Sequence, residues 1–360
     1  MSIKLEGLNA MPIRTWRRLG VNDTSLTFAF PENAGRQSAR EPEMTLPEGI
    51  AELDRDLEPG AHFVSAVGAE SEDLTRARRN AGLCISAPQG ARLTRPAVAR
   101  YTLGGGDALH DRNLIVAETG SRIDVVVSYE SRGGAGPAFH SGLTRVIARR
   151  CSRVRFVSVQ MLGADDAHIS DFAAICEEGA RVEYTQIELG AARVVSGCHA
   201  DLRGGDSSAS VNTFYFGDGE RVLDFNNIVR HAGERTKSAM KANGALLGNA
   251  EKIYKGTLDF VRGSKRAAGS ETENTLLFSP DARSRSAPLI LCGEEDVDGR
   301  HAATIGRLDG AELFYMLSRG LTETEAKRLI ARSLLGAAMS AAEDERLRAD
   351  ADKFLSERIK

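Results

Sequence analysis

Short runs of alternating or continuous apolar residues follow one another through the middle of the chain, from Tyr101 to Leu308. No long helical pattern interrupts the series, which argues against alternating strand–helix units. Each run is preceded by a small or turn-forming residue, and the clearest runs are 123–127, 154–159, 182–187, 210–216 and 253–258. The pattern predicts a mainly β core of short strands joined by tight turns.

The starts of successive runs recur at a nearly constant spacing. Gly120-Ser121-Arg122, Cys151-Ser152-Arg153 and Gly179-Ala180-Arg181 each precede a run, and a period of roughly 28 to 31 residues is typical of stacked repeats. A solenoid of short strands, a β-helix, fits best, because each rung buries its inward residues against its neighbours. A β-sandwich is the structural alternative, and the scarcity of Asn-Gly hairpin turns weakens it.

Helical patterns flank this core. Ser71 to Asn80 begins with a capping serine and ends in arginines, which predicts a short surface helix. After Asp309, apolar residues fall at helical spacing, and Thr322 with Glu325 predicts a capping box. The predicted organisation is a mixed α/β N-terminal region over 1–100, a β-helix core over 101–308 and a C-terminal α-helical domain over 309–360.

Composition excludes few function classes. The 360 residues include 47 basic and 50 acidic ones, and the formal charge of -3 gives no sign of nucleic-acid binding. The basic run from Arg145 to Arg155 alternates with apolar residues, so we expect it on the solvated face of strands. No signal peptide and no run of about 18 apolar residues is found, which predicts a cytoplasmic protein without membrane contact.

The five cysteines are odd in number and widely spaced, which argues against a disulfide framework and against a local zinc site. Cys292 differs from the others because three acidic residues and a histidine follow it within ten positions: Glu294, Glu295, Asp296 and His301. Thiolate, imidazole and carboxylate in one short segment indicate a metal or sulfur site. On spacing alone, a buried strand cysteine and a hydrogen-bonded turn histidine are the simpler interpretation.

Several motifs in about the last 250 residues extend this picture. They are 224–231 with Thr236-Lys237-Ser238, the strand 270–279, Pro288, Asp296-Val297, His301 to Thr304, and Phe314-Tyr315 with Ser318-Arg319-Gly320. Together they resemble the SufB/SufD family, scaffold subunits of the SUF iron–sulfur cluster assembly machinery. The resemblance implies a right-handed parallel β-helix and a C-terminal helical domain that binds the SufC ATPase. The candidate partner-binding residues are Phe314, Tyr315, Ser318, Arg319, Gly320, Ala326, Leu329 and Ile330.

The resemblance also assigns roles to two cysteines. In SufB-type chains a cysteine nine residues before the histidine is implicated in holding the nascent cluster, and Cys292 and His301 have this separation. A second cysteine, beyond a Trp-Thr-Gln motif, is thought to receive sulfur; here Tyr184-Thr185-Gln186 precedes Cys198. SufB-type chains follow the histidine with a glutamate, whereas this chain has Ala302. Glu294, Glu295 and Asp296 are therefore the candidate oxygen ligands, in a chain that mixes SufB-like and SufD-like patterns.

We therefore expect a non-catalytic scaffold that receives sulfur and builds a transient iron–sulfur cluster at a subunit interface. The expected partners are a SufC-like ATPase, a second copy or a paralogous SufB/SufD chain, and a cysteine desulfurase or other sulfur donor. Gly104-Gly105-Gly106 lacks the Lys-Ser/Thr of a P-loop, so no nucleotide site is expected in this chain.

Two alternatives stay open. A β-helix polysaccharide lyase or hydrolase would use paired carboxylates such as Asp165-Asp166 or Glu177-Glu178. Adjacent acids on a strand point to opposite faces, which argues against it. The other alternative is a metal-free, SufD-like platform, in which neither Cys292 nor Cys198 matters.

Overall fold

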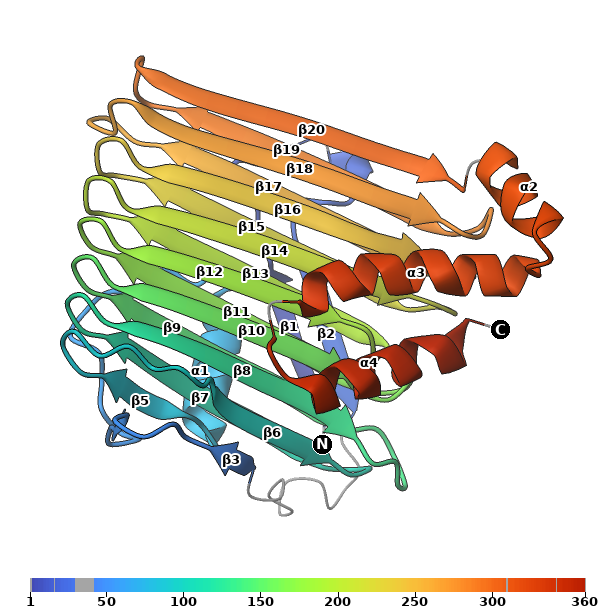
Figure 1. Cartoon of the computed structure of the whole chain (residues 1–360), viewed down its shortest axis with the longest axis horizontal. Helices are drawn as coiled ribbons and strands as arrows, with labels where there is room; N and C mark the ends of the chain where they lie inside the picture. The colour runs from blue at the N-terminus through green and yellow to red at the C-terminus, as the bar shows by residue number, and fades with distance from the viewer. Residues whose placement is uncertain (1, 16, 30–41, 309, 341, 360) are drawn as a thin grey trace.

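Two long parallel sheets, stacked rung on rung, form the body of the protein in a computed structural model that describes residues 2–15, 17–29, 42–308, 310–340 and 342–359. From β5 onward the chain alternates between the sheets, so that odd- and even-numbered strands lie on opposite sides of one elongated core (Figure 1). This parallel β-solenoid confirms the predicted β-helix fold, and the β-sandwich alternative is wrong because each of these strands pairs in parallel with the strand two positions away in sequence, whereas the sheets of such sandwiches are antiparallel.

The first sheet contains nine strands in the described part of the chain. Their bounds are β3 (Glu43–Thr45), β6 (Ala97–Leu103), β8 (Arg122–Ser131), β10 (Arg153–Met161), β12 (Arg181–Glu188), β14 (Ser208–Gly217), β16 (Lys237–Leu246), β18 (Ala267–Leu277) and β20 (Val297–Arg307). Within it Arg122 pairs with Arg153, and Arg153 with Arg181. The three turn motifs of the sequence thus start successive rungs, as the repeat spacing predicts.

The second sheet also contains nine strands among the described residues, and its parallel register continues to the end of the solenoid. Their bounds are β4 (Ala51–Glu52), β5 (Cys84–Ala87), β7 (Ala108–Ala117), β9 (Phe139–Ala148), β11 (Ala167–Cys176), β13 (Arg193–Leu202), β15 (Val222–His231), β17 (Glu251–Phe260) and β19 (Arg283–Cys292). Since β5 and β6 already pair in parallel with β7 and β8, the sheets begin on the N-terminal side of residue 101.

Alternate residues of every strand point into the space between the sheets. Aromatic rings fill part of it: Phe172 and Tyr184 stack with centroids 3.9 Å apart, and Tyr101 stacks on Tyr129 at 5.5 Å. Each rung covers the apolar side chains of its neighbours, so the core is continuous from Leu83 to Ala282.

Three helices follow the solenoid, and two of them cover the outer face of the first sheet within the described chain. They are α2 (Gly310–Ser318), α3 (Glu323–Met339) and α4 (Glu345–Arg358), and α3 and α4 pack on apolar residues that point outward from the strands (Figure 1). Thr322 and Glu325 form the predicted capping box at the start of α3. Among the described residues no helix is both long and apolar enough to cross a bilayer.

The N-terminal region covers the outer face of the second sheet. It consists of an antiparallel pair, β1 (Ser2–Leu8) and β2 (Thr24–Ala29), a short 3₁₀ turn η1 (Arg17–Leu19) and helix α1 (Ala69–Arg78). Apolar residues of β1 and β2 pack on Phe139, Ile169 and Val195. Helix α1 matches the helix expected over 71–80.

One basic residue contradicts the sequence interpretation. Arg145, expected on a solvated face, is 1% exposed. Its Nη2 lies 3.1 Å from Asp171 Oδ2 and 3.1 Å from Glu72 Oε2 of α1. The face of β9 that carries Arg145 is covered by the N-terminal region, and only such tertiary cover gives a buried guanidinium two carboxylate partners.

A second buried ion pair fastens the N-terminal segment to the solenoid. Lys255 Nζ lies 2.8 Å from Asp224 Oδ1 and donates to the carbonyl of Asn9 at 2.9 Å. Asn9 Nδ2 in turn donates to Asp224 Oδ1 at 2.8 Å. All three residues are buried, so removing one charge leaves the other without its counterion in a medium of low dielectric constant.

We therefore predict that Lys255→Met lowers the free energy of unfolding by about 3 kcal/mol or more, because Asp224 loses its buried partner. Urea denaturation followed by circular dichroism measures this loss. Lys237→Met, at an exposed lysine of β16, is the matched control and should leave the midpoint nearly unchanged. Equal midpoints for the two variants would contradict the role of the buried pair.

Candidate functional site

The last rung of the solenoid, β19 and β20, is open on one side. No element of the described chain lies beyond these strands (Figure 1). The exposed edges leave backbone N–H and C=O groups without strand partners, and Ile290 and Ile305 are 37% and 44% exposed. A long exposed edge with apolar side chains is a template for pairing with another chain.

Cys292 and His301 both lie on this last rung and both are exposed. A Cβ built on Gly299 would lie 3.1 Å from Ile290 Cγ2, so residues 290 and 299 face each other across the rung. Continuing this register places His301 opposite Pro288, four residues along from Cys292. At 3.3 Å per residue the two candidate ligands are about 13 Å apart along the strands. One chain therefore cannot bring both to the same metal ion.

The three acidic candidates lie in the turn between β19 and β20. Glu294 Oε2 accepts the N–H of Gly263 at 2.9 Å, and this bond, with further backbone donors in the turn, lowers the pKa of the Glu294 carboxyl. The carbonyl of Asp296 accepts the N–H of Arg266 at 2.6 Å. The turn acids are thus close to Cys292 in the chain and remote from His301.

The described residues contain no group of three or more His, Cys, Asp or Glu side chains in metal-binding geometry. The sequence analysis placed Cys292, His301 and the turn acids in one site, and the structure does not bring them together within a single subunit.

Polar side chains that the sequence analysis missed lie directly beneath the last rung. His301 pairs in register with Glu271 on β18, and Glu273 follows two residues later on the same inward face. Glu273 Oε1 accepts a hydrogen bond from Lys252 Nζ, and both residues are almost completely buried. Burial lowers the pKa of Lys252, although Glu273 opposes this shift. The sequence does contain a sign of this cluster: two glutamates, 271 and 273, stand at alternate positions of one strand and therefore share its inward face.

Cys198 lies inside the solenoid, on the inward face of β13, and is 0% exposed. Burial, with smaller contributions from Asp171 and Cys176, raises the pKa of its thiol well above the usual range. The register continues from Cys198 through Asn227 and Gly256 to Pro288, so Cys198 is three rungs below the open end. Because the thiolate is the nucleophile, this environment argues against sulfur acceptance in the closed conformation.

The motif before Cys198 is also internal. Gln186 Oε1 accepts from the Ser196 hydroxyl, and Gln186 Nε2 donates to Thr213 Oγ1 at 2.7 Å. Asn227 Nδ2 donates to the same threonine oxygen at 3.0 Å. These hydrogen bonds satisfy polar groups within the core and fix the side chains around Cys198.

The partner-binding candidates divide by exposure. Phe314, Tyr315 and Leu329 are 71%, 58% and 52% exposed. Ser318, Arg319 and Gly320 are exposed beside them, and the Arg319 guanidinium carbon lies 5.3 Å from the centre of the Tyr315 ring. Ala326 is buried and Ile330 packs partly against the solenoid, so these two hold α3 in place.

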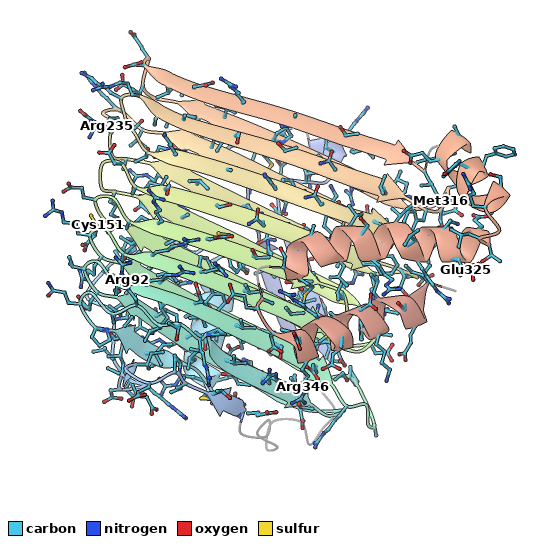
Figure 2. All side chains as sticks on the ribbon, viewed as in Figure 1. Arg92, Cys151, Arg235, Met316, Glu325 and Arg346 are labelled. Carbon is cyan, nitrogen blue, oxygen red and sulfur yellow. The ribbon has the colours of Figure 1, made fainter. Side chains whose placement is uncertain are left out.

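These exposed residues gather at one end of the helical domain. Figure 2 shows Met316 and Glu325 there, beyond the ends of the strands, whereas Cys151 and Arg235 mark the opposite rim of turns. An apolar cluster of this kind, contiguous and bordered by polar residues, is typical of a protein-binding surface.

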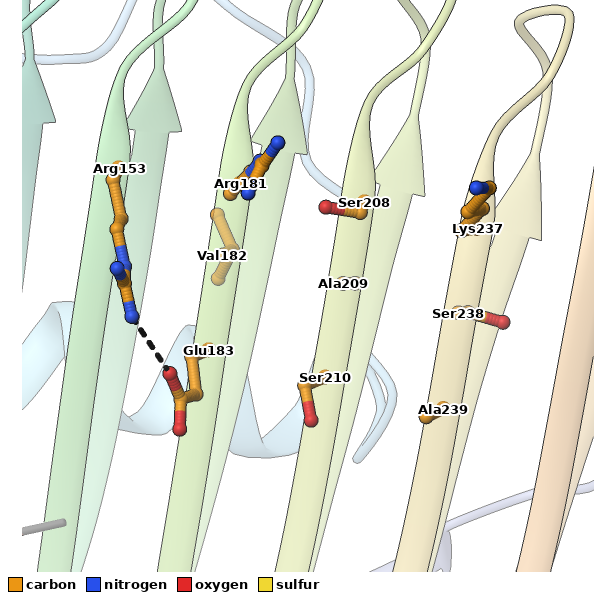
Figure 3. Close-up of a pocket in the computed structure, with 10 residues that line it drawn as sticks. All are labelled: Arg153, Arg181, Val182, Glu183, Ser208, Ala209, Ser210, Lys237, Ser238 and Ala239. Atoms are coloured by element: carbon orange, nitrogen blue, oxygen red, sulfur yellow. Dashed lines mark ion pairs between the residues drawn. The ribbon is translucent and has the colours of Figure 1, made fainter.

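A groove also lies on the outer face of the first sheet. Arg153, Arg181 and Lys237 line it, with Ser208 and Ser210 between them (Figure 3). Arg153 Nη2 lies 3.6 Å from Glu183 Oε2. The groove is cationic, contains a single carboxylate and lies away from the last rung.

The acid pairs considered for a polysaccharide lyase are engaged in turns. Asp166 accepts the N–H groups of Ala138 and Gly163, at 2.7 and 2.6 Å. Glu177 lies 2.8 Å from Arg149, and Glu178 is 3.5 Å from Arg150. Neither pair converges on a groove, so no observation favours this alternative.

Comparison with known proteins adds an independent finding. Residues 101–334 match the family described as SUF system FeS cluster assembly, SufBD core domain. The iron–sulfur cluster assembly protein SufD of Bacillus subtilis is 26% identical over 253 residues, which are 70% of this chain and 58% of that protein. A SufBD family protein of Mycobacterium leprae is 24% identical over 225 residues, or 62% of this chain and 26% of that one. The chain thus spans less than two thirds of the length of either relative.

The positions of the cysteines predict their reactivity. Under native, reducing conditions a maleimide should modify Cys151 and Cys292, which are exposed, and leave Cys84, Cys176 and Cys198 unmodified until the chain is unfolded in urea. Peptide mass spectrometry after timed labelling measures the rates, with Cys292→Ser as control. Labelling of native Cys198 as fast as Cys292 would show that the interior opens, and would support the sulfur-acceptor role.

Proposed function

Since the chain belongs to the SufB/SufD family of the SUF iron–sulfur cluster assembly system, we propose that it is a scaffold subunit that builds a labile cluster at the open end of its solenoid. One observation carries this proposal: the exposed last rung presents a thiol and an imidazole, Cys292 and His301, on strands that have no neighbour on one side within the described chain. Thiolate is the preferred ligand of iron–sulfur clusters, and imidazole replaces it in some of them.

A second subunit is needed to complete the ligand set. The separation of about 13 Å between Cys292 and His301 exceeds what one small cluster spans with direct ligands. Pairing of the open edge with another solenoid, either a second copy or a paralogous SufB/SufD chain, would add the partner's ligands and satisfy the free backbone groups. Such a shared, incomplete ligand set favours release of the finished cluster.

Sulfur reaches the site from a cysteine desulfurase or another donor protein. Cys292 is an exposed thiol within the proposed assembly site, whereas the Cys198 thiol is buried inside the solenoid. A route through Cys198 would require the interior to open, so this role stays a prediction. In either case the chain acts as an acceptor and scaffold, and we propose no catalytic step of its own.

A SufC-like ATPase is the proposed source of energy. Phe314 and Tyr315 on α2 form the centre of the exposed apolar cluster, and large aromatic residues of this kind commonly dominate binding energy at protein interfaces. The polar border formed by Ser318 and Arg319 suits a reversible contact.

Anaerobic reconstitution with Fe²⁺ and sulfide tests the scaffold role. We expect oxygen-sensitive visible charge-transfer bands in the wild type and loss of most of their intensity in Cys292→Ala and in His301→Ala, because each removes a ligand. Cys151→Ser, which removes an exposed thiol in the turn between β9 and β10, five rungs below the β19–β20 turn on the same rim, is the matched control and should retain the bands. A wild type without bands, even with its ATPase partner present, would indicate a metal-free, SufD-like subunit.

Partner binding is tested separately. The double variant Phe314→Ala/Tyr315→Ala should weaken association with a SufC-like ATPase by about tenfold or more, because both exposed rings are removed. Isothermal titration calorimetry measures the affinity. Arg346→Ala changes an exposed residue at the far end of the helical domain and is the control (Figure 2). Unchanged affinity in the double variant would place the ATPase elsewhere.

A further inference from the structure

The residue directly beneath His301 is a carboxylic acid. The parallel register of β18 and β20 pairs Glu271 with His301, and both side chains point to the inner side of the sheet. Neighbouring strands lie about 4.8 Å apart. A metal ion with two ligands at about 2 Å each spans about 4 Å, so these side chains are within bridging reach.

The Glu271 side chain is enclosed and unpaired. The residue is 2% exposed, and neither carboxyl oxygen has a hydrogen-bond partner in the described part of the chain. The buried ammonium group of Lys252 donates to Glu273 instead. Burial, followed by repulsion from Glu273, raises the pKa of Glu271 to about 7. A buried, unsatisfied carboxyl group is costly for stability, so its presence calls for a functional reason.

The opposite sheet leaves room for this carboxyl group. A Cβ built on Gly256 of β17 would lie 2.3 Å from Glu271 Oε1 and 2.6 Å from Oε2. Gly256 pairs with Pro288 of the last rung, which faces His301. The glycine therefore admits the carboxyl group to the layer immediately below His301.

We propose that Glu271 is a ligand for iron at the open end, binding together with His301 as one half of a site that the second subunit completes. This inference rests on the proposed scaffold function. It names an oxygen ligand for a chain that has Ala302 where SufB-type chains have a glutamate. An imidazole and a carboxylate suit Fe²⁺. The turn acids Glu294, Glu295 and Asp296 are less suitable, since each lies at least five residues from His301, more than about 15 Å along an extended strand.

Fe²⁺ binding by the full-length chain tests the assignment. The experiment uses anaerobic competition with a chromophoric chelator, without sulfide, so that metal affinity is measured apart from cluster assembly. Glu271→Gln keeps the size of the side chain and removes its charge, and we expect affinity to fall at least about tenfold. Gly256→Ala, whose methyl group displaces the Glu271 carboxyl, should also weaken binding. Visible d–d bands of bound Co²⁺ report whether the ligand set changes.

Glu188→Gln is the matched control, because Glu188 is also a buried glutamate of the solenoid interior. It lies on β12, three rungs below β18 and four rungs below β20. It should bind Fe²⁺ as the wild type does. Circular dichroism and urea midpoints identify any variant that fails to fold, and Gly256→Ala provides a second test if Glu271→Gln is unstable.

The outcomes separate the two proposals. Weaker Fe²⁺ binding in Glu271→Gln and His301→Ala, with an altered Co²⁺ spectrum, supports the ligand pair. If His301→Ala binds weakly and Glu271→Gln binds normally, Glu271 is not a ligand, while the scaffold site at His301 stands. If both variants bind Fe²⁺ as tightly as the wild type, the metal binds elsewhere. Both the Glu271 assignment and the proposed scaffold site at the open end are then rejected.

Discussion

Each strand of the solenoid satisfies its backbone hydrogen bonds on the rungs above and below it, so stacking is the interaction on which the rest of the structure depends. The same constraint makes the last rung incomplete, because β19 and β20 have neighbours on one side only. At the other end the sheets finish in the short antiparallel strands β3 and β4, of three and two residues. Short edge strands are poor templates for pairing with another chain, whereas β19 and β20 offer a long parallel edge, and the candidate ligands lie at this long edge.

Charged side chains are buried in the core next to this open edge. A purely apolar core would be simpler to stabilise, yet Lys252, Glu271 and Glu273 lie immediately below the last rung. Replacing buried ion pairs by apolar residues is often neutral or stabilising, so such groups are weak contributors to stability. The buried pair of Lys255 and Asp224 has an evident structural role in fastening the N-terminal segment. Glu271 has no equivalent partner, which is why a ligand role explains its position better than packing does.

Local patterns predicted much of the fold. The turn motifs before Arg122, Arg153 and Arg181 fixed the period because every rung repeats the same local geometry, and the capping box at Thr322 is a contact within one turn of helix. The site was less predictable, since it depends on register between strands distant in sequence. Nine residues separate Cys292 and His301, and a hairpin-like path would bring them close; the register across the rung instead sets them apart. Glu271 becomes visible only once β18 is placed under β20.

The geometry also indicates how a partner at α2 would affect the ligands. Arg307 ends β20, the strand that carries His301, and Gly310 begins α2. No residue of α2 is buried, whereas Ala331 and Leu335 of α3 pack into the outer face of the sheet. The helix that carries Phe314 and Tyr315 is therefore held to the solenoid mainly through its chain connections to β20 and α3. If the proposed ATPase binds there, a displacement of α2 would reach the free edge along the backbone before it affects the stacked rungs, because the edge strand has fewer neighbours. The strand that presents His301 would then be the part of the solenoid most responsive to that partner.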